Sequence, residues 1–323
     1  MTGRIVTIIG GKQNTFFYVM IEEDGEYKDT VINCTSKGVF RKKKIKPLVG
    51  DIVEIAIDYN NKVGNQVTGI VEKISERKNS LVRPSIANID VLFIVTAIKS
   101  PAPSYYFIDK ITAIAADNEI ESVIILNKTD LADDDAETDE IYDIYTKAGF
   151  VVIKTSAVTS DGGLDEIKRA MDGKVCAFAG ASGVGKSTLL NKIFSELNLN
   201  LETNSLSEKI ARGKHTTRTV ELFKNKSGYV ADTPGFSVLD FEKFNYILKD
   251  NLVFAFPDLC LYVEDNFGCK YTKCTHTKED GCVIIKAVGE GKIAKTRHES
   301  YVQLYEELKN QKDWELKEKE KDN

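Results

Sequence analysis

A glycine-rich segment at residues 180–187 has a composition that could bind phosphate. It reads Gly-Ala-Ser-Gly-Val-Gly-Lys-Ser and matches the pattern G-x-x-x-x-G-K-[ST]. The glycines let the backbone curl until consecutive N–H groups point inward, while Lys186 adds a full positive charge and the hydroxyl of Ser187 can bind Mg²⁺. A plain glycine-rich turn before a helix would not explain why lysine and serine follow directly. The residues predicted to hold the phosphates are Gly180, Ala181, Ser182, Gly183, Val184, Gly185, Lys186, Ser187 and Thr188.

A second segment, Asn-Lys-Thr-Asp at residues 127–130, could select the base of a nucleotide. A carboxylate at Asp130 can accept two hydrogen bonds from the N1–H and the exocyclic amine of guanine, which adenine does not offer in that arrangement. Left unpaired and partly buried, the same carboxylate would penalise adenine. A four-residue pattern also arises by chance, so it needs support from other segments. The residues that this segment assigns to base recognition are Asn127, Lys128 and Asp130.

Two further segments support a guanine nucleotide site. The run Thr-Ser-Ala is suited to present the backbone N–H groups of Ser156 and Ala157 to the guanine oxygen. The run Asp-Thr-Pro-Gly at 232–235 places Asp232 where it can hold Mg²⁺ through water, and the amide of Gly235 where it can sense a γ-phosphate. Together the four segments predict a site for GTP or GDP with Mg²⁺. A P-loop kinase or ATPase is the weaker alternative, and the base-selecting carboxylate argues against it.

A cluster of sulfur and imidazole side chains near residue 275 could bind a metal ion. Its spacing is C-x₄-C-x-H-x₅-C, and its Cys₃His composition is that of a structural zinc site. All four positions are protein ligands, which leaves no open place for water. The alternative is a set of buried cysteines beside a core histidine. The predicted ligands of one structural Zn²⁺ are Cys269, Cys274, His276 and Cys282, while Cys34, Cys176 and Cys260 lie outside the cluster.

The composition of the chain is that of a folded protein with more than one domain. Its 323 residues are 42% hydrophobic and 29% charged, with 6 prolines, which excludes collagen-like, mucin-like and wholly disordered classes. The net charge of -5 makes nucleic-acid binding through global charge unfavourable, so such binding would need a local patch. Since no apolar run approaches the ~18 residues that span a bilayer, we expect a cytoplasmic protein.

Residues 1–75 carry the first group of elements that must position these side chains. Short alternating segments separated by turn signals predict about five strands, which fits a small β-barrel of the OB type. A basic cluster in this part could contact RNA phosphates, and the alternative is a solvated loop. Its residues are Lys37, Arg41, Lys42, Lys43, Lys44 and Lys46.

Residues 76–238 alternate strand and helix signals, which is typical of a parallel sheet with helices on both sides. The base-selecting and phosphate-binding segments follow predicted strands, so they emerge at the carboxyl edge of the sheet, where such folds bind ligands. The predicted strands are 90–96, 122–126, 151–154 and 175–179, and the predicted helices are 105–118, 139–148, 164–171 and 186–197.

The four nucleotide-binding segments resemble those of translation-factor-like GTPases, but their order along the chain differs. Here the base-selecting segment precedes the phosphate-binding segment, whereas the ordinary domain begins with the phosphate loop. Because the site is assembled in space from strand ends, joining the old termini and opening another connection preserves it. We therefore predict a circularly permuted α/β P-loop GTPase domain.

Residues 239–323 are predicted to form a mainly helical, zinc-binding domain that ends in a solvated, fraying helix. The predicted domain boundaries are thus 1–75, 76–238 and 239–323. The segment after 232–235 runs almost directly into the last domain, so nucleotide state could be transmitted as a domain movement.

A barrel, a permuted GTPase domain and a Cys/His-rich helical domain closely resemble the RsgA (YjeQ or EngC) family over nearly the whole chain. The segments that carry the resemblance are 77–84, 127–130, 180–188, 213–217, 232–235, the cysteine cluster and 297–301. The resemblance implies a GTP hydrolase that binds the small (30S) ribosomal subunit and its 16S rRNA in late maturation, with GTP state controlling association and release. It also implies zinc and a monomer. The alternative is a non-catalytic, GTP-gated assembly factor that binds rRNA.

The residue that activates water must differ from that of Ras-like enzymes, because Phe236 stands where they carry glutamine. His215 is the best candidate, since an imidazole can accept a hydrogen bond from water, and the resemblance points to the same residue. A solvated loop histidine is the alternative. The threonine run of the family is interrupted by Arg218, and we favour Thr217 over Thr216 for contact with Mg²⁺ and the γ-phosphate.

Overall fold

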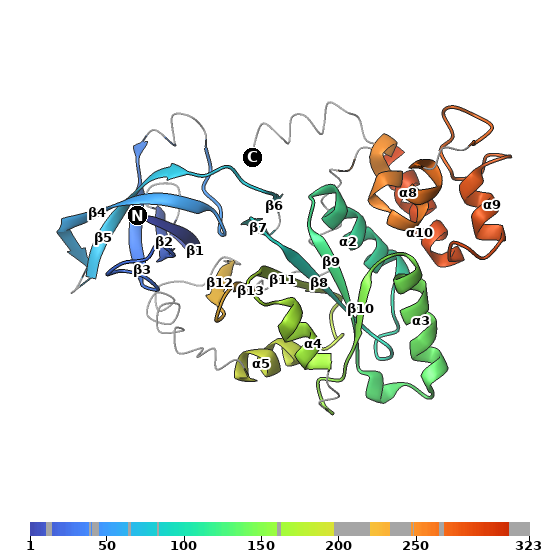
Figure 1. Ribbon diagram of the computed structural model, residues 1–323, viewed down its shortest axis with the longest axis horizontal. Coiled ribbons are helices and arrows are strands. Elements are labelled where there is room, and N and C mark those ends of the chain that lie inside the picture. The colour runs from blue at the N-terminus through green and yellow to red at the C-terminus, as the bar shows by residue number, and fades with distance from the viewer. Residues whose placement is uncertain are drawn as a thin grey trace. The chain divides into compact units, whose positions relative to one another are not determined.

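The computed structural model describes most of the chain, apart from several internal segments and the last residues (Figure 1). Its described residues are 1–10, 15–38, 40, 45–63, 66–82, 84–159, 163–196, 220–232, 247, 249–264 and 268–309. They belong to two compact units. The first comprises Met1–Asp90, Met171–Ala177 and Phe194–Gly235, and the second comprises Val91–Ala170, Phe178–Ile193 and Phe236–Asn323.

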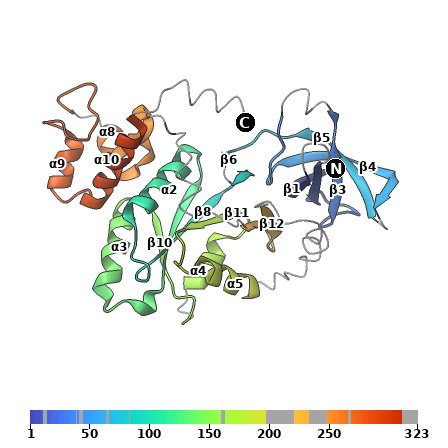
Figure 2. The same cartoon turned by 180° about the vertical axis from the view of Figure 1, so that it is seen from behind.

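The N-terminal part of the first unit is a closed five-stranded barrel, seen from two sides in Figures 1 and 2. Its strands follow the order β1-β2-β3-β5-β4, and β4 pairs back with β1. Alternate side chains point inward, so Phe17, Val19 and Ile21 of β2 are all buried. The barrel confirms the predicted OB-type fold. The strands are β1 (Thr2–Gly10), β2 (Thr15–Ile21), β3 (Val31–Ser36), β4 (Ile52–Val63) and β5 (Gln66–Ile74).

Strand β1 changes partner along its length. Its first residues pair with β4 and close the barrel. The register of its pairing with β2 then shifts between Ile5 and Thr7. Past this irregularity, Thr7 pairs with Glu221 of β12 (Glu221–Lys224), which forms an antiparallel hairpin with β13 (Tyr229–Asp232). Strand β13 also pairs in parallel with the start of β11 (Val175–Gly180). A short hairpin, β6 (Ser80–Val82) and β7 (Ser85–Ala87), follows the barrel.

The second unit contains the predicted alternation of strands and helices. Strands β8 (Val91–Ala97), β9 (Glu121–Asn127) and β10 (Val151–Lys154) run parallel, and the end of β11 lies next to β8. All seven residues of β8 are buried, as expected for a strand covered on both faces. Helix α2 packs on β8 and β9, and α3 packs on β9 and β10. The helices are α2 (Tyr105–Asp117), α3 (Asp135–Lys147), α4 (Gly163–Ala170) and α5 (Lys186–Glu196), and η1 (Thr129–Leu131) is a single 3-10 turn.

One helix begins earlier than predicted. The sequence predicted a start at residue 139, but α3 begins at Asp135 because the carboxylate of Asp134 accepts a hydrogen bond from the backbone N–H of Glu137. This contact satisfies an N–H group that has no partner within the helix. The carboxylate of Glu137 in turn accepts from the N–H of Asp133, the residue before the N-cap, and so holds the chain at the start of the helix.

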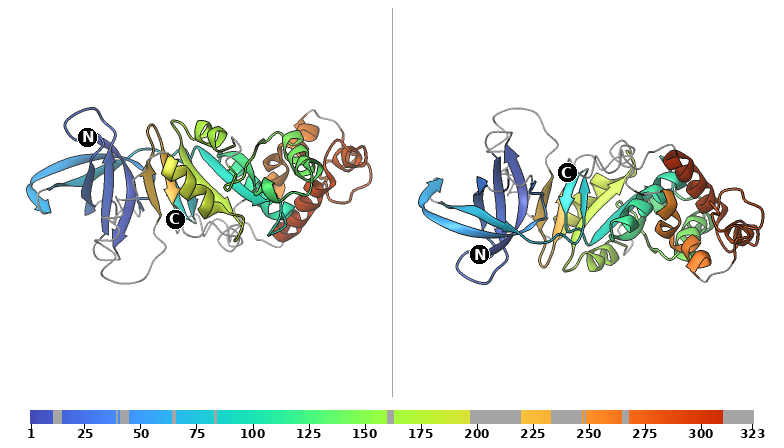
Figure 3. Two further views of the ribbon diagram at one scale, coloured as in Figure 1. Left: turned by 90° about the horizontal axis from the view of Figure 1, so that it is seen from below. Right: turned by 90° about the horizontal axis from the view of Figure 1, so that it is seen from above.

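The C-terminal part of the second unit is helical, as predicted. It contains η3 (Lys249–Ala255), α8 (Pro257–Glu264), α9 (Val283–Gly289) and α10 (Lys295–Lys309). Figure 3 shows α10 running alongside α2, against which it packs. The predicted fraying tail lies outside the described residues, and the three predicted domain boundaries stay a prediction. Among the helices of the described segments, none has the length and apolar character needed to cross a membrane.

Candidate nucleotide and metal sites

The phosphate-binding segment lies where the sequence placed it, between the end of β11 at Gly180 and the start of α5 at Lys186. Gly183 and Gly185 have φ angles of 82° and 90°, which L side chains rarely adopt. A Cβ atom on Gly185 would lie only 2.4 Å from Nδ2 of Asn127, so glycine is required for this close approach. Ser187, the predicted magnesium ligand, is exposed at the start of the helix.

The base-selecting segment contacts the phosphate-binding segment directly, although they lie far apart in the chain. Asn127 Nδ2 donates a hydrogen bond to the carbonyl oxygen of Val184 at 2.8 Å. Lys128 Nζ donates to the carbonyl oxygen of Gly183 at 2.7 Å and to that of Ser100. Lys128 itself has a left-handed backbone, with φ 62°. These bonds fix the spacing between the two segments, as a single nucleotide site requires.

The segment around Ser156 orients the carboxylate that is predicted to recognise guanine. The hydroxyl of Ser156 donates to Oδ1 of Asp130 at 2.6 Å, and it accepts from the backbone N–H groups of Val158 and Thr159 at 3.2 Å each. Ser156 is fully buried, whereas Asp130 is exposed and thus open to a ligand. The N–H of Ala157 donates to Oδ1 of Asn127 at 3.3 Å.

A lysine that sequence reasoning missed joins this loop to the phosphate-binding helix. Nζ of Lys192, on α5, donates to the carbonyl oxygen of Ala157 at 3.0 Å. The contact joins the loop that is predicted to face the base to the helix that is predicted to face the phosphates. A lysine in a helix carries no sequence signal for such a role, because its partner lies 35 positions away.

Several predicted site residues cannot be placed. His215, Thr216, Thr217 and Gly235 lie outside the described residues, as does the side chain of Asp232. The backbone of Asp232 ends β13 in the first unit, paired with Glu221 of β12. The roles of these residues stay predictions.

The basic cluster is described only at its two ends. Nζ of Lys37 forms an exposed ion pair with Glu72 at 2.6 Å, and the carbonyl oxygen of Lys46 accepts from Arg77. Exposed pairs of this kind contribute little free energy, so the pair leaves Lys37 able to exchange Glu72 for a phosphate. Arg41, Lys42, Lys43 and Lys44 lie outside the described residues.

The four predicted metal ligands come together at one point. Their ligand atoms all lie within 4.8 Å of one another, so this group could hold a metal ion. Sγ of Cys269 is 3.9 Å from Sγ of Cys282 and 3.6 Å from Nδ1 of His276, which is 3.4 Å from Sγ of Cys282. Tetrahedral zinc with ordinary bond lengths would separate two sulfurs by about 3.8 Å and a sulfur from a nitrogen by about 3.5 Å. The donor set and its spacing therefore fit zinc.

The protonation of the thiols opposes metal binding at low pH. Burial raises the pKa of Cys274 to about 12, and it also raises the pKa of Cys282. A bound cation needs the thiolates, so it must displace these protons.

A glutamate holds the loop that carries the metal ligands. The carboxylate of Glu279 accepts from the backbone N–H groups of Thr275 at 2.9 Å and of Thr277 and Lys278 at 3.1 Å, and also from the hydroxyl of Thr275. Burial by itself would raise the pKa of Glu279, but these hydrogen bonds outweigh it and hold the pKa at about 2. The charged carboxylate thus stabilises the loop between Cys274 and Cys282.

Helix α10 supports the metal loop and joins it to the rest of the second unit. Nε2 of His298 donates to the carbonyl oxygen of His276 at 2.7 Å, and the hydroxyl of Tyr301 donates to that of Thr275 at 2.9 Å. These two residues belong to segment 297–301, for which sequence analysis gave no role.

Arg297, on the same helix, is buried with two carboxylates. Its guanidinium bonds Asp109 of α2 at 2.6 Å and binds both oxygens of Asp258 of α8, at 2.6 and 3.1 Å. The guanidinium carbon lies 4.7 Å from the centre of the Phe256 ring. Burial raises the pKa of Asp109, and the charge of Arg297 offsets this only in part. The three helices are therefore joined by one ionic group shielded from water.

Comparisons with known proteins agree with this geometry. Residues 74–242 match the family model described as RsgA GTPase, and residues 2–64 match the RsgA N-terminal domain. A protein of Agathobacter rectalis named small ribosomal subunit biogenesis GTPase RsgA is 40% identical over 317 residues, covering 96% of this chain and 99% of its own. The protein of that name from Bacillus subtilis is 39% identical over 313 residues, covering 96% and 98%.

Two solved structures are similar over nearly the whole chain. The crystal structure of YloQ, a circularly permuted GTPase, has a TM-score of 0.74 at 33% identity and covers 96% of both chains. The crystal structure of YjeQ from Thermotoga maritima has a TM-score of 0.76 at 34% identity, covering 97% of this chain and all of that one. The predicted circular permutation is thereby confirmed.

Proposed function

Because this chain belongs to the RsgA family of circularly permuted GTPases, we propose that it hydrolyses GTP while bound to the small (30S) ribosomal subunit and acts in late maturation of that subunit. GTP favours association with the subunit, and hydrolysis favours release. The contacts of Asn127 and Lys128 with the phosphate-binding segment carry this proposal. They bring the base-selecting segment against the phosphate-binding segment, although the base-selecting segment comes first in the chain.

The roles proposed for the nucleotide-binding residues follow from their positions. The carboxylate of Asp130, oriented by Ser156, accepts from guanine, and the amides of segment 180–188 with Lys186 hold the phosphates. Ser187 binds Mg²⁺, with Thr217 and a water-mediated contact from Asp232 as further support. This arrangement favours GTP over ATP, which competition between the two nucleotides in a binding assay would measure.

We propose His215 as the residue that positions the attacking water, with slow turnover until the subunit orders its loop. The alternative is a non-catalytic, GTP-gated rRNA-binding factor. This alternative stays open because Phe236 stands where Ras-like enzymes carry the glutamine that orients water. Multiple-turnover phosphate release with and without small subunits separates the two. For His215→Ala we expect loss of the stimulated rate with unchanged GTP affinity, measured by stopped-flow binding; unchanged stimulated turnover would reject the role.

Zinc is the metal that the Cys₃His group is proposed to hold, through Cys269, Cys274, His276 and Cys282. A closed, four-ligand zinc site supplies a cross-link rather than catalysis, and here it would join the two ends of the segment between Cys269 and Cys282, directly ahead of α9. Elemental analysis of the purified protein should find one zinc per chain, and a chelator should unfold the C-terminal helices.

The partner proposed for the barrel is 16S rRNA, bound by a protein monomer in the cytoplasm. The basic cluster supports this proposal, together with the barrel itself. We further propose that the chain divides into three domains, with boundaries after residues 75 and 238. Phosphate contacts release counterions, so binding should weaken steeply with salt. Turnover titrated with isolated small subunits at two salt concentrations would test the partner and the electrostatic contribution together.

A further inference from the structure

The β12–β13 hairpin is placed to report nucleotide state. It lies in the chain between segment 213–217 and segment 232–235, the two segments that are proposed to contact Mg²⁺ and the γ-phosphate. Strand β13 ends at Asp232, and only two residues separate Asp232 from Tyr229 at the start of the strand. Any change in the backbone at Asp232 therefore reaches Tyr229 through one short, fully paired strand.

The barrel is attached to this hairpin within the first unit. Thr7 of β1 pairs with Glu221, and the hydroxyl of Thr7 reaches the carbonyl oxygen of Val220 at 3.5 Å. Lys224, at the end of β12, forms an ion pair with Asp29 in the loop between β2 and β3. The hairpin therefore continues from the side of the barrel, joined by backbone pairing and by charge.

Arg4 is the side chain that joins the barrel to Tyr229. Nε of Arg4 pairs with Glu22 at 2.8 Å, Nη1 donates to the carbonyl oxygen of Gly50 at 3.1 Å, and the guanidinium carbon lies 5.3 Å from the centre of the Tyr229 ring. The side chain of Arg4 is 12% exposed and Tyr229 is 5% exposed, so solvent screens this contact little. Three attachments leave the guanidinium few alternative positions.

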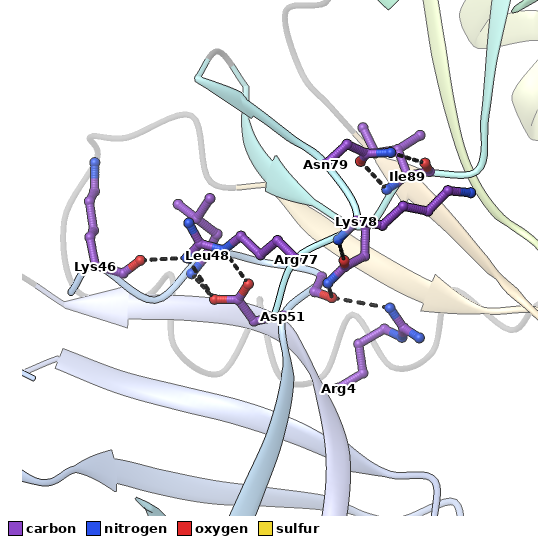
Figure 4. A network of polar contacts seen from close by, with 10 residues as sticks. Arg4, Lys46, Leu48, Asp51, Arg77, Lys78, Asn79 and Ile89 are labelled. Atoms are coloured by element: carbon purple, nitrogen blue, oxygen red, sulfur yellow. Dashed lines mark hydrogen bonds and ion pairs between the residues drawn. The ribbon is translucent and has the colours of Figure 1, made fainter. Parts of the chain in front are cut away.

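The turn that Arg4 binds is itself held rigidly, as Figure 4 shows. Arg77 binds both carboxylate oxygens of the fully buried Asp51, at 2.7 and 3.0 Å, and Oδ2 of Asp51 accepts from the N–H of Leu48 at 2.7 Å. Gly50 has φ 91°, and a Cβ atom there would lie 2.1 Å from the carbonyl oxygen of Ala87. Arg4 thus links a fixed part of the barrel to the strand that leads to Asp232.

We propose that Arg4 and Tyr229 couple the nucleotide state of the GTPase domain to the affinity of the barrel for the ribosomal subunit. They are positioning residues, because neither belongs to a segment that is proposed to bind nucleotide or Mg²⁺. A movement of β13 displaces the Tyr229 ring, and the buried guanidinium transmits that displacement to β1, since packed groups switch between discrete arrangements rather than stretch. The inference rests on the proposed function. Sequence analysis predicted that nucleotide state is transmitted to the C-terminal domain, and the inference adds transmission to the barrel.

The test measures the dissociation constant of the full-length protein for isolated small subunits, with GDP and with a non-hydrolysable GTP analogue. In Arg4→Met we expect the ratio of the two dissociation constants to move toward one. The expected change in the ratio is at least about fivefold, or the whole of the wild-type ratio if that ratio is smaller. Intrinsic GTP turnover and GDP affinity should stay at wild-type values. Arg4→Lys keeps the charge without the planar fork and should give an intermediate ratio. Lys28→Met, which removes only an exposed ion pair with Asp24 on the same barrel, is the matched control.

A second pair of variants keeps the test decisive if Arg4→Met does not fold. Tyr229→Phe retains the ring under the guanidinium, so the ratio of the two dissociation constants should stay at its wild-type value. Tyr229→Leu removes the ring, so the ratio should fall toward one. A wild-type ratio in folded Tyr229→Leu would overturn the proposal, and so would equal losses of affinity in both nucleotide states. A ratio of one in the wild-type protein would instead contradict the proposed function itself.

Discussion

At the scale of single residues, the carboxylate of Asp130, which is proposed to bind guanine, is already oriented by a hydrogen bond from Ser156. Asp130 is exposed, and a free carboxylate there would sample several rotamers. The hydroxyl of Ser156, itself fixed by two backbone N–H groups, donates to one oxygen and selects one orientation. The cost of ordering the carboxylate is therefore met in folding rather than in binding.

Replacement of Ser156 by alanine tests this arrangement. We expect GDP affinity to fall by about tenfold, since a hydrogen bond to a charged group contributes about 1.5 kcal/mol, and the preference for guanine over adenine to narrow. Titration with fluorescent GDP, in competition with unlabelled GTP and ATP, measures both effects. Thr159→Ala is the control, because Thr159 takes part in this set of bonds through its backbone. Wild-type affinity in a folded Ser156→Ala protein would show that Asp130 needs no support.

Sequence patterns located the phosphate and base segments because each requires particular residue types at fixed spacing. They gave no structural role to Lys192, Arg4 or Arg297, which have partners 35, 46 and 188 positions away. A single basic residue contributes no spacing that a pattern could detect. Contacts of this kind depend on how elements pack, which the sequence of one element does not contain.

At the scale of elements, the metal loop depends on a carboxylate as well as on its proposed ligands. The pKa of Glu279 is about 2 in the folded protein, below its ordinary value near 4.5. A group whose folded pKa is depressed contributes stability that is fully present above its unfolded pKa and is lost as pH falls through its folded pKa. The contribution of Glu279 should therefore be complete at neutral pH and decline between pH 4.5 and 2.

Glu279→Gln should lower the stability of the metal loop at neutral pH by roughly 1 kcal/mol, because the amide accepts fewer and weaker hydrogen bonds. Thermal unfolding and retention of bound metal measure the effect, with Asp280→Asn, an exposed neighbour, as the control. The difference between wild type and Glu279→Gln should shrink as pH is lowered from 4.5 toward 2. A difference that stays constant across this range would mean that the charge of Glu279 does not hold the loop.

Elements were easier to predict than their boundaries. The strands of the second unit follow from apolar runs and turn signals, but the start of α3 depends on side-chain capping by Asp134 and Glu137. The segment after the barrel is rich in polar residues, yet it forms β6 and β7. Its polar side chains are paired with distant groups, such as Arg77 with Asp51, so their polarity does not mean that the segment is exposed to solvent.

At the scale of the whole molecule, permutation changes which parts of the chain are joined covalently to the nucleotide site. The chain continues from segment 232–235 into the C-terminal helices, and those helices are fastened to α2 through Arg297. The helical part is thus continuous in the chain with the segment that is proposed to sense nucleotide. It is also anchored to α2, so a response to nucleotide would not require it to detach.

Arg297→Met tests that anchor. The variant leaves Asp109 and Asp258 buried without a cationic partner, so we expect a loss of about 3–5 kcal/mol in the free energy of unfolding of the second unit. Thermal and urea unfolding measure the loss. A triple variant that also replaces both aspartates by leucine should recover much of the stability, since an apolar group of similar size can replace a buried ion pair. Equal stability of wild type and Arg297→Met would mean that the carboxylates are held by other groups.

The change of partner along β1 also determines how much of its backbone edge is covered. An unpaired strand edge can template pairing with another chain, and closure of a barrel removes such edges. Here closure by β4 covers only the first residues of β1, and the hairpin covers the edge near Thr7. The β12–β13 hairpin thus serves as a cap, and damage to it would expose a backbone edge prone to aggregation.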